Sequence, residues 1–579
     1  MTDAPDAVTL AVLKGRLEQI ADEMDATLYR SAFNPIIAEA RDACHGLYHP
    51  STGATLVQGT RGLPIFVGAM AFAVKAVIDK VAKDGNLDPG DTFLFNDPYD
   101  GGTHLNDFRL VRPVFRNGKL FCWIASVGHW IDIGGNVPGG FNARATDSFQ
   151  EGVRIPPVKL IRNGALDRDI VAILEANSRV PVSNWGDLNG QLNALALGEQ
   201  RLAALLDDYG DATVEAAFEA FTARAEAMMR ARIAELPDGR YTFEDFLDND
   251  GIVDERLTIA LDLTIAGDSM VLDFSRTSPP CAGPLNIAYS TAVACCYVAL
   301  KHVFTEVPAN GGCLAPITFV IPETTLLAAR HPRPVGGYTE TILRAIGVVF
   351  GALAQAAPAR ATAAPFGTIN ALSLAGKRAD GKPWVMFSFF GGGLGGNPES
   401  DGLSHGNNAI STATMPPAEI LEAANPVMFT QWALRPDSAG PGAHRGGFGA
   451  VYEIEALVDD TDGFLLGERG KFPPFGVVGG GAAALNRFVW TSDTGTSSAP
   501  MVSKVTDVKL RRGQRVRLET PGGGGWGDPM RRDPARVAQD VRQGLISSEA
   551  ARRDYGVAVT EDGRLDAAAT ALLRKEVAA

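Results

Sequence analysis

The pattern of apolar and polar positions predicts several helices. Residues 7–31 repeat apolar side chains at helical spacing, from Leu13 and Leu17 to Met24 and Leu28, which is typical of an amphipathic helix. A long Ala/Leu-rich stretch is expected to form two or more helices that break near Gly210, because glycine weakens a helix. Helices are predicted at residues 7–31, 66–83, 193–235, 288–304 and 340–357.

Other segments alternate like strands. TFLF at residues 92–95 reads as a strand, and residues 255–275 read as two strands around a Gly-Asp turn. From residue 383 to 520 strands and glycine turns dominate, and the tail carries two helical segments, Asp533–Gln543 and Leu565–Val577, which are expected to pack as a small cap. The class is therefore α+β and multidomain, with mixed sheets, glycine-rich turns, packed helices and a helical C-terminal tail. Expected regions are 1–237, 238–335, 336–530 and 531–579.

One hairpin can be placed in register by arithmetic. The strand-like runs FRLVRPVF and LFCWIASV are separated by RNGK, and Asn-Gly between such runs is a strong hairpin signal. A two-residue turn at Asn117-Gly118 pairs Arg116 with Lys119, so that Asp107 lies opposite Gly128. A three-residue loop shifts the pairing by one residue and sets Asp107 opposite His129. Both registers stay open, and both bring Asp107 and His129 to neighbouring positions.

Composition narrows the class of protein. The chain has 579 residues, of which 46% are hydrophobic and 21% charged, as in globular proteins of two to four domains. The net charge of −14 disfavours nucleic acid and anionic membranes as partners. No apolar run is long enough to span a membrane, and the N-terminus does not resemble a signal peptide. The six cysteines lack C-x-x-C spacing and are expected to be buried thiols in the cytoplasm.

The end of the predicted hairpin carries candidate metal ligands. His104 lies three residues before Asp107, and His129 lies three residues before Asp132. A single His-x-x-Asp is more often an ordinary turn pair, but two at the open end of one hairpin favour a site. Two imidazoles and a carboxylate suit Mn²⁺, Fe²⁺ or Zn²⁺ with positions open for substrate or water. Asp132 and Asp97 could orient an imidazole from outside the ligand set. The remaining histidines are weaker candidates: 45, 49, 302, 331, 405 and 444.

Several common catalytic motifs are missing from the sequence. There is no G-x-x-x-x-G-K-[ST] loop and no G-x-S-x-G elbow, so nucleotide-binding residues are not expected in this chain. The runs GGGLGG at 391–396 and GGGGWGD at 522–528 could cradle a phosphate. Such runs in turn-rich β structure more often serve tight turns and close packing.

The blocks around these residues resemble the hydantoinase B / 5-oxoprolinase family. NDPYDGGTHLND and GHWIDIGG match two family blocks, and the similarity continues through VLDFSRTSP, PVGGYTETILRAIG, LRPDSAGPGAHRGG and TPGGGGWGDP. It therefore spans nearly the whole chain. The family includes ATP-dependent hydrolases of N-methylhydantoin, 5-oxoproline and caprolactam, as well as acetone and acetophenone carboxylases.

This resemblance implies a subunit of a multi-component enzyme. A hydantoinase A-type partner would bind ATP and phosphorylate a small-molecule substrate, and the B-type subunit would hold one divalent metal ion and complete the reaction. The implied ligands are His104, Asp107 and His129, which would also be the catalytic residues. The family's E-R-x-D-F-S block reads EARDAC here, which adds Asp42 to the ligand set.

The chain departs from the family pattern at two positions of the expected substrate pocket. Phe66 stands where the family usually has histidine, and Tyr338 replaces a polar residue. A more aromatic pocket would suit a bulkier or less polar substrate. Hydrolysis of a cyclic amide is the first hypothesis, carboxylation of a ketone with a small third subunit is the second, and a non-catalytic scaffold is the third.

Overall fold

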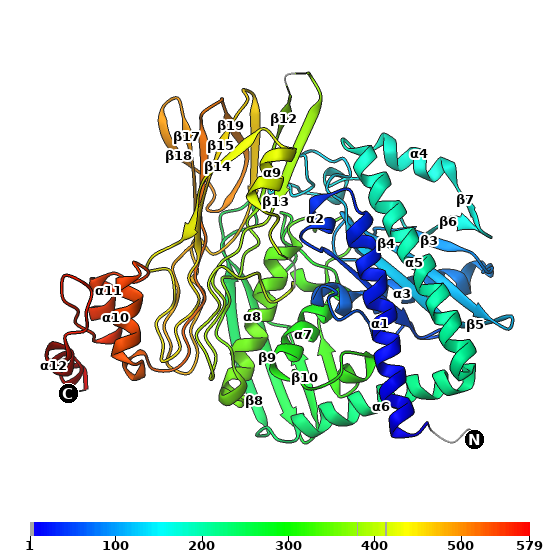
Figure 1. The fold of residues 1–579 in the computed structure, drawn as a ribbon, viewed down its shortest axis with the longest axis horizontal. Helices are drawn as coiled ribbons and strands as arrows, with labels where there is room; N and C mark the ends of the chain where they lie inside the picture. Colours follow the sequence, from blue (N-terminus) through cyan, green and yellow to red (C-terminus); the bar gives the residue numbers. More distant parts are fainter. Residues whose placement is uncertain (1–4, 379, 412–413, 579) are drawn as a thin grey trace. The chain divides into compact units, whose positions relative to one another are not determined.

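The computed structural model describes residues 5–378, 380–411 and 414–578. The chain divides into two compact units that are each built from separate stretches of sequence. The first unit comprises Met1–Arg240, Asp262–Tyr338 and Ile410–Pro416, and the second comprises Tyr241–Leu261, Thr339–Ala409 and Pro417–Ala579. The four regions expected from the sequence stay a prediction. The α+β class is confirmed, because both units combine helices with largely antiparallel sheets (Figure 1).

The first unit is built on a seven-stranded antiparallel sheet of order β2-β1-β5-β4-β3-β6-β7. Its strands are β1 (Ala43–Tyr48), β2 (Thr55–Gln58), β3 (Thr92–Phe95), β4 (Asp107–Arg116), β5 (Lys119–His129), β6 (Val158–Arg162) and β7 (Ala165–Leu166). The predicted hairpin is the β4–β5 pair at the centre of this sheet. Strand β1 lies against β5 on the other side and pairs Ala43 with Gly128.

Helices cover this sheet. They are α1 (Ala7–Ser31), α2 (Pro35–Ala38), α3 (Pro64–Asp84), α4 (Arg168–Ala176), α5 (Pro181–Tyr209), α6 (Asp211–Ile233) and α7 (Tyr289–Val303). Helix α1 begins at its Asp6 cap, which accepts from the N–H groups of Val8 and Thr9 at 2.9 and 3.0 Å. Figure 1 shows α1 and α5 running alongside each other over the strands. Gly198 of α5 faces Met24 so closely that a Cβ would lie 2.4 Å from its sulfur.

The predicted helices match the observed ones, with one difference in length. The break at Gly210 is confirmed, but α5 begins at Pro181 instead of residue 193. Its first turns contain Asn184, Asp187 and Gln191, which are buried although they are polar. These residues interrupt the apolar periodicity, so the pattern alone could not extend the helix to its true start.

A second, mixed sheet has the order β11-β10-β9-β8. The strands are β8 (Gly239–Leu247), β9 (Leu257–Ala266), β10 (Ser269–Asp273) and β11 (Ile317–Val320). Strands β9 and β10 are antiparallel around the predicted Gly-Asp turn, and β10 and β11 are parallel, with α7 in the connection between them. A parallel pair needs such a crossover.

The second unit contains α8 (Tyr338–Ala356) and two antiparallel sheets of order β13-β12-β16-β19 and β14-β15-β20-β17-β18. Their strands are β12 (Ala371–Lys377), β13 (Pro383–Ser388), β14 (Val427–Leu434), β15 (Ala450–Ala456), β16 (Thr461–Leu466), β17 (Arg487–Ser492), β18 (Gly495–Ser498), β19 (Lys504–Leu510) and β20 (Arg515–Glu519). The other helices are α9 (Ala418–Ala424), α10 (Pro534–Arg542), α11 (Ser548–Tyr555) and α12 (Ala567–Ala578). Short 3₁₀ turns of both units lie at Ser148–Gln150, Gly311–Leu314, Leu326–Ala328, Pro358–Arg360 and Pro529–Arg531.

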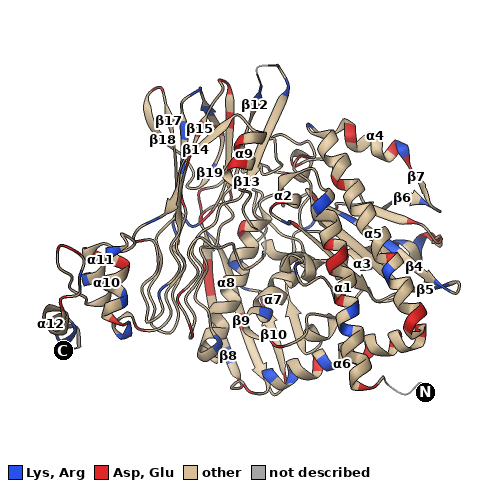
Figure 2. Cartoon of the chain, viewed as in Figure 1, with Lys and Arg blue, Asp and Glu red and all other residues tan. Residues whose placement is uncertain are grey.

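The C-terminal tail folds as helices, as predicted, with α11 as an additional one. Helices α10 and α11 pack on Phe448 through Val537, Ala551 and Tyr555. All six cysteines are buried, as expected. Across the described residues, no helix combines the length and the apolar character needed to cross a membrane. Acidic and basic residues are interspersed along the chain in both units (Figure 2).

Glycine-rich segments of the second unit pack backbone against backbone. Gly393 donates to Pro521 O at 3.1 Å, Gly523 donates to Gly447 O at 3.0 Å, and Gly447 donates to Leu394 O at 2.8 Å. Figure 1 shows these segments, from yellow to orange, as extended stretches side by side. A Cβ on Gly523 would lie 1.9 Å from Leu394 O. This glycine layer therefore leaves no room for side chains, and the glycine runs serve packing here.

A buried charged cluster also lies in the second unit. Glu468 accepts from Lys504 Nζ at 2.5 Å and from the N–H of Asp248 at 2.8 Å. The Glu340 carboxyl is fully buried and accepts from the N–H of Ile369 at 2.9 Å. Burial, reinforced by the negative charge of Glu468, raises the pKa of Glu340 to about 8.

The glycine layer predicts a strong difference between two Gly→Ala substitutions. Gly523→Ala should destabilise the protein by about 3 kcal/mol or more, because the new methyl group collides with the backbone of Leu394. Gly15→Ala is the matched control, since Gly15 is an exposed residue of α1 with nothing within 4 Å of the added carbon. Thermal unfolding should show a large decrease for the first and an unchanged or higher midpoint for the second. Equal midpoints would contradict the close packing.

The raised pKa of Glu340 predicts a pH dependence of stability. In the unfolded chain this carboxyl loses its proton near pH 4.5, whereas in the folded chain it keeps the proton up to about pH 8. Stability should therefore fall as pH rises through this window, because the folded state binds the extra proton. In the Glu340→Gln variant, the urea concentration at the unfolding midpoint should fall less between about pH 5.5 and about pH 8.5 than it does in the wild-type chain. The exposed Glu399→Gln should keep the wild-type slope, and a slope unchanged by Glu340→Gln would refute the assignment.

Candidate functional site

The β4–β5 hairpin carries the predicted pair directly opposite each other. Its turn is the two-residue Asn117-Gly118, with Arg116 opposite Lys119, and the register then shifts by one residue between Val114 and Phe115. From there to the open end the pairing follows the other predicted register. Asp107 consequently lies opposite His129. Each of the two registers expected from the sequence is correct for one part of the hairpin.

The loop from β3 to β4 brings His104 to the same place. Gly101 has a φ of 83°, and a Cβ there would lie 2.5 Å from the carbonyl oxygen of Phe72 in α3. The carbonyl of Gly102 accepts hydrogen bonds from Ser290 Oγ at 3.1 Å and Thr291 Oγ1 at 3.0 Å. The loop is thus held between α3 and the start of α7, and this fixes the position of His104.

His104, Asp107 and His129 form a close triangle of ligand atoms. His104 Nε2 lies 3.1 Å from Asp107 Oδ1 and 3.2 Å from His129 Nδ1. His129 Nδ1 lies 3.3 Å from Asp107 Oδ1. Atoms bound at about 2.1 Å to one ion lie roughly 3.0 Å apart at right angles and about 3.4 Å apart at tetrahedral angles. The three side chains are at most 3% exposed. The triangle could hold a divalent metal ion with little rearrangement.

Asp42 lies beside this triangle, just before β1. Its carbonyl accepts from the N–H of His129 at 3.2 Å. Its Oδ1 is shielded from solvent and has no hydrogen-bond partner among the described residues. Burial raises the pKa of Asp42 to about 7, while His129 lowers it and Asp107 raises it. A buried carboxylate oxygen without a partner is costly unless a ligand occupies it. Among the described residues, however, the ligand atoms that lie within 4.8 Å of one another are those of His104, Asp107 and His129, without Asp42.

The electrostatics of the triangle favour an ionised Asp107. Burial alone would raise its pKa, but His104 and His129 hold the pKa of Asp107 well below its usual range. Burial lowers the pKa of His104, against the opposing effect of Asp107. For His129 the hydrogen bond and charge of Asp107, together with Asp42, outweigh burial and raise its pKa. The ionised carboxylate offers lone pairs to a cation, and each imidazole does so in its neutral form.

Residues of α5 contact the β4–β5 hairpin directly or through Asn34, and the sequence did not predict them. Asp187 Oδ2 accepts from Asn34 Nδ2 at 2.8 Å, and the same amide donates to the carbonyl of His129 at 3.0 Å. Gln191 donates to the carbonyl of Phe108 at 3.0 Å and accepts from Trp130 Nε1 at 3.1 Å. The sequence offered one signal for these residues, their polar character in the buried first turns of a helix. That signal does not identify their hydrogen-bond partners.

Asp132 and Asp97 lie near the site but contact other groups. Asp132 accepts from the N–H groups of Gly134 and Gly139 at 3.1 and 3.2 Å and from Arg179 Nη1 at 2.9 Å. Asp97 accepts from the N–H of Tyr99 at 3.0 Å and from Arg154 Nη1 at 2.7 Å. Asp97 therefore holds the loop that carries His104, and Asp132 holds the loop that follows His129.

Aromatic rings surround the imidazoles. Tyr338 stacks on His104 with ring centroids 4.5 Å apart, and Phe141 lies 5.4 Å from His104 and 6.1 Å from His129. Tyr338 is only 4% exposed, so it covers one side of the triangle. Phe66 is a buried residue of α3. Of the two predicted pocket residues, Tyr338 thus contacts a triad histidine.

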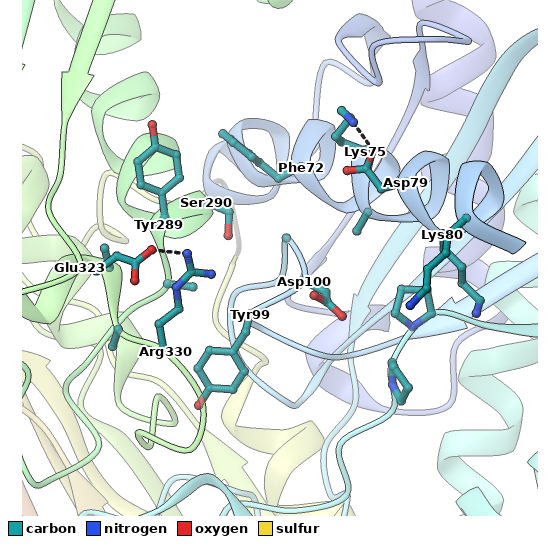
Figure 3. Close-up of a pocket in the computed structure, with 18 of the residues that line it drawn as sticks. Phe72, Lys75, Asp79, Lys80, Tyr99, Asp100, Tyr289, Ser290, Glu323 and Arg330 are labelled. Carbon is teal, nitrogen blue, oxygen red and sulfur yellow. Dashed lines mark hydrogen bonds and ion pairs between the residues drawn. The ribbon is translucent and has the colours of Figure 1, made fainter.

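A cavity of about 890 Å³ opens close to the His104 loop. Figure 3 shows its wall, with Phe72 and Lys75 of α3 on one side and Tyr289 and Ser290 of α7 on another. Tyr99, Asp100 and Gly101 also line it, and the chain reaches His104 three residues later. A second cavity of about 960 Å³ lies between α1, α6 and α7. The triad itself is buried outside both linings.

Known proteins resemble this chain over nearly its full length. Caprolactamase subunit beta of Pseudomonas jessenii is 33% identical over 98% of this chain and 98% of that protein. The crystal structure of ATP-dependent caprolactamase from the same organism superimposes with a TM-score of 0.89 at 31% identity, covering 99% of this chain and 100% of that one. A nucleotide-free acetone carboxylase superimposes with a TM-score of 0.90 at 22% identity over 99% of this chain and 83% of that one, which is a likeness of fold.

The family comparison agrees with the blocks that the sequence contains. The hydantoinase B/oxoprolinase family matches residues 6–529. This span includes the whole of the first unit's sheet and the glycine-rich segments of the second unit. The chain belongs to the hydantoinase B/oxoprolinase family.

Proposed function

We propose that this chain is the metal-containing B-type subunit of an ATP-dependent enzyme that hydrolyses a cyclic amide. The substrate would be a small hydantoin-like, oxoproline-like or lactam-like molecule, phosphorylated beforehand by a hydantoinase A-type partner. The observation that carries this proposal is the buried triangle of His104 Nε2, Asp107 Oδ1 and His129 Nδ1, with sides of 3.1–3.3 Å. We also propose that the protein is located in the cytoplasm.

The donor set fits one Mn²⁺, Zn²⁺ or Fe²⁺ ion. His104, Asp107 and His129 would hold it, and Asp42 would be the fourth ligand through its unpartnered Oδ1. When bound, such an ion polarises a carbonyl oxygen and lowers the pKa of water. Tyr338 and Phe141 exclude bulk water from the imidazoles, which strengthens electrostatic interactions inside the site. Tyr338 and Phe66 are proposed to border the substrate.

Two features of the chain support the proposal that a partner subunit binds ATP. Its sequence has no P-loop, and its glycine runs are used for backbone packing, so ATP is proposed to bind to the A-type subunit. The name of the caprolactamase relative supports this arrangement, since that protein is a beta subunit. The superimposed crystal structure from the same organism is that of an ATP-dependent caprolactamase, which supports cleavage of a cyclic amide here.

Ketone carboxylation and a non-catalytic scaffold are the alternatives. The acetone carboxylase likeness is at 22% identity and concerns the fold, whereas identity to the caprolactamase subunit is 33%. Hydrolysis is therefore favoured, and a small third subunit belongs only to the carboxylase alternative. A scaffold would not need three converging buried ligand atoms.

The metal site predicts a stoichiometric ion in the purified chain. Elemental analysis should find about one Mn, Zn or Fe per chain, and His104→Ala and His129→Ala should each lose most of it because one of few ligand atoms is removed. His331→Ala is a matched control on an exposed histidine and should retain the ion. A wild-type chain that takes up none of these metals after dialysis against them would contradict the site.

The proposed reaction predicts ATP-dependent ring opening by the complex with an A-type partner. His129→Ala should lower turnover of hydantoin, 5-oxoproline or lactam substrates by more than about 100-fold, with assembly of the complex unchanged in gel filtration. Product analysis should show the ring-opened acid. Full activity of the variant would point to a scaffold, and incorporation of labelled bicarbonate into the product would point to a carboxylase.

A further inference from the structure

The two oxygens of Asp107 have different surroundings. Oδ1 faces the histidines at 3.1 and 3.3 Å. Oδ2 points to the other side, where it accepts a hydrogen bond from Thr103 Oγ1. Thr103 is fully buried one residue before His104. A carboxylate can bind a metal through one oxygen or through both, so the contacts of Oδ2 bear directly on how Asp107 can act as a ligand.

Arg109 fixes the direction of the hydrogen bond from Thr103. Its Nη2 donates to Thr103 Oγ1 at 2.5 Å, and its Nη1 donates to the carbonyl of Asp107 at 2.7 Å. Guanidinium has donors only, so the threonine oxygen must accept from Arg109 and its single hydrogen is left for Asp107. The chain of donation therefore runs one way, from Arg109 to Thr103 to Asp107 Oδ2.

Arg109 also brings a positive charge to the occupied oxygen. The guanidinium is buried to 0% exposure, and its Nη2 lies 4.0 Å from Asp107 Oδ2. It lies two residues after Asp107 in β4, so both side chains project from the same face of the sheet. Burying an arginine away from water is costly unless its charge is paired and its N–H groups are hydrogen-bonded. Its hydrogen bonds and its ion pair go to Thr103 and Asp107, while its Nε has no hydrogen-bond partner among the described residues.

We propose that Thr103 and Arg109 are positioning residues that restrict Asp107 to a single metal-binding oxygen. With Oδ2 held, only Oδ1 is free to complete the triangle with the two histidines. One-atom ligation leaves more coordination positions for substrate or water than two-atom ligation would. This inference rests on the proposed metal site, and it adds how the site keeps positions open.

Thr103→Val tests the inference, because it removes the hydroxyl and keeps a branched side chain of similar shape. The full-length chain is loaded with Mn²⁺ alone, and crystal structures of wild type and variant are compared at Asp107. We expect one Asp107 oxygen on manganese in wild type and two in Thr103→Val, with the Kd for Mn²⁺, from the signal of the free ion in electron paramagnetic resonance, raised about tenfold or more. Thr103→Ser keeps the hydroxyl and should restore one-oxygen ligation.

The number of Asp107 oxygens bound to manganese decides whether the inference holds. One-oxygen ligation in Thr103→Val would overturn the inference, as would two-oxygen ligation in wild type, and in both cases the proposed function would stand. A wild-type chain that binds none of Mn²⁺, Zn²⁺ and Fe²⁺ would overturn the proposed function and the inference together. If Thr103→Val does not fold, Thr103→Ala provides the same comparison. Arg109→Lys, which keeps the charge but can make only one of the two bonds in the same geometry, should weaken Mn²⁺ binding less than Thr103→Val.

Discussion

The pairing of β4 with β5 is the constraint on which the site depends. A one-residue shift near the turn sets Asp107 opposite His129 at the open end. Because side chains alternate between the two faces of a strand, a hairpin without this shift would place Asp107 opposite Gly128. The neighbouring strand β1 pairs Ala43 with Gly128 of this hairpin, and Gln191 of helix α5 donates to the carbonyl of Phe108.

The sequence predicted much of this framework because its local signals agree. Asn-Gly defined the turn, helical periodicity located α1, α3, α7 and α8, and the His-x-x-Asp spacings located the triad residues. The shift between Val114 and Phe115 could not be predicted, since it depends on how both faces of the sheet pack. The role of α5 was also hidden, because Asp187 and Gln191 find their partners far away in the sequence.

Asp42 illustrates a different limit. A lone carboxylate in EARDAC carries no spacing signal, and only the resemblance to the family singled it out. In the fold, the backbone carbonyl of Asp42 accepts a hydrogen bond from the N–H of His129, and the side-chain Oδ1 of Asp42 has no hydrogen-bond partner among the described residues. Burial of such groups is expensive, so the chain keeps opposing charges close together, as Arg109 and Asp107 do.

The glycine layer of the second unit has a thermodynamic consequence. Segments that contact one another through backbone atoms, as Gly393 and Gly523 do, bury amide groups and very little hydrocarbon. Exposure of hydrocarbon is what raises heat capacity on unfolding, whereas exposure of polar groups lowers it. This layer therefore contributes less heat capacity per residue than the helix-covered sheet of the first unit. Its stability should vary less steeply with temperature, so cooling should weaken it less than the apolar core around α1.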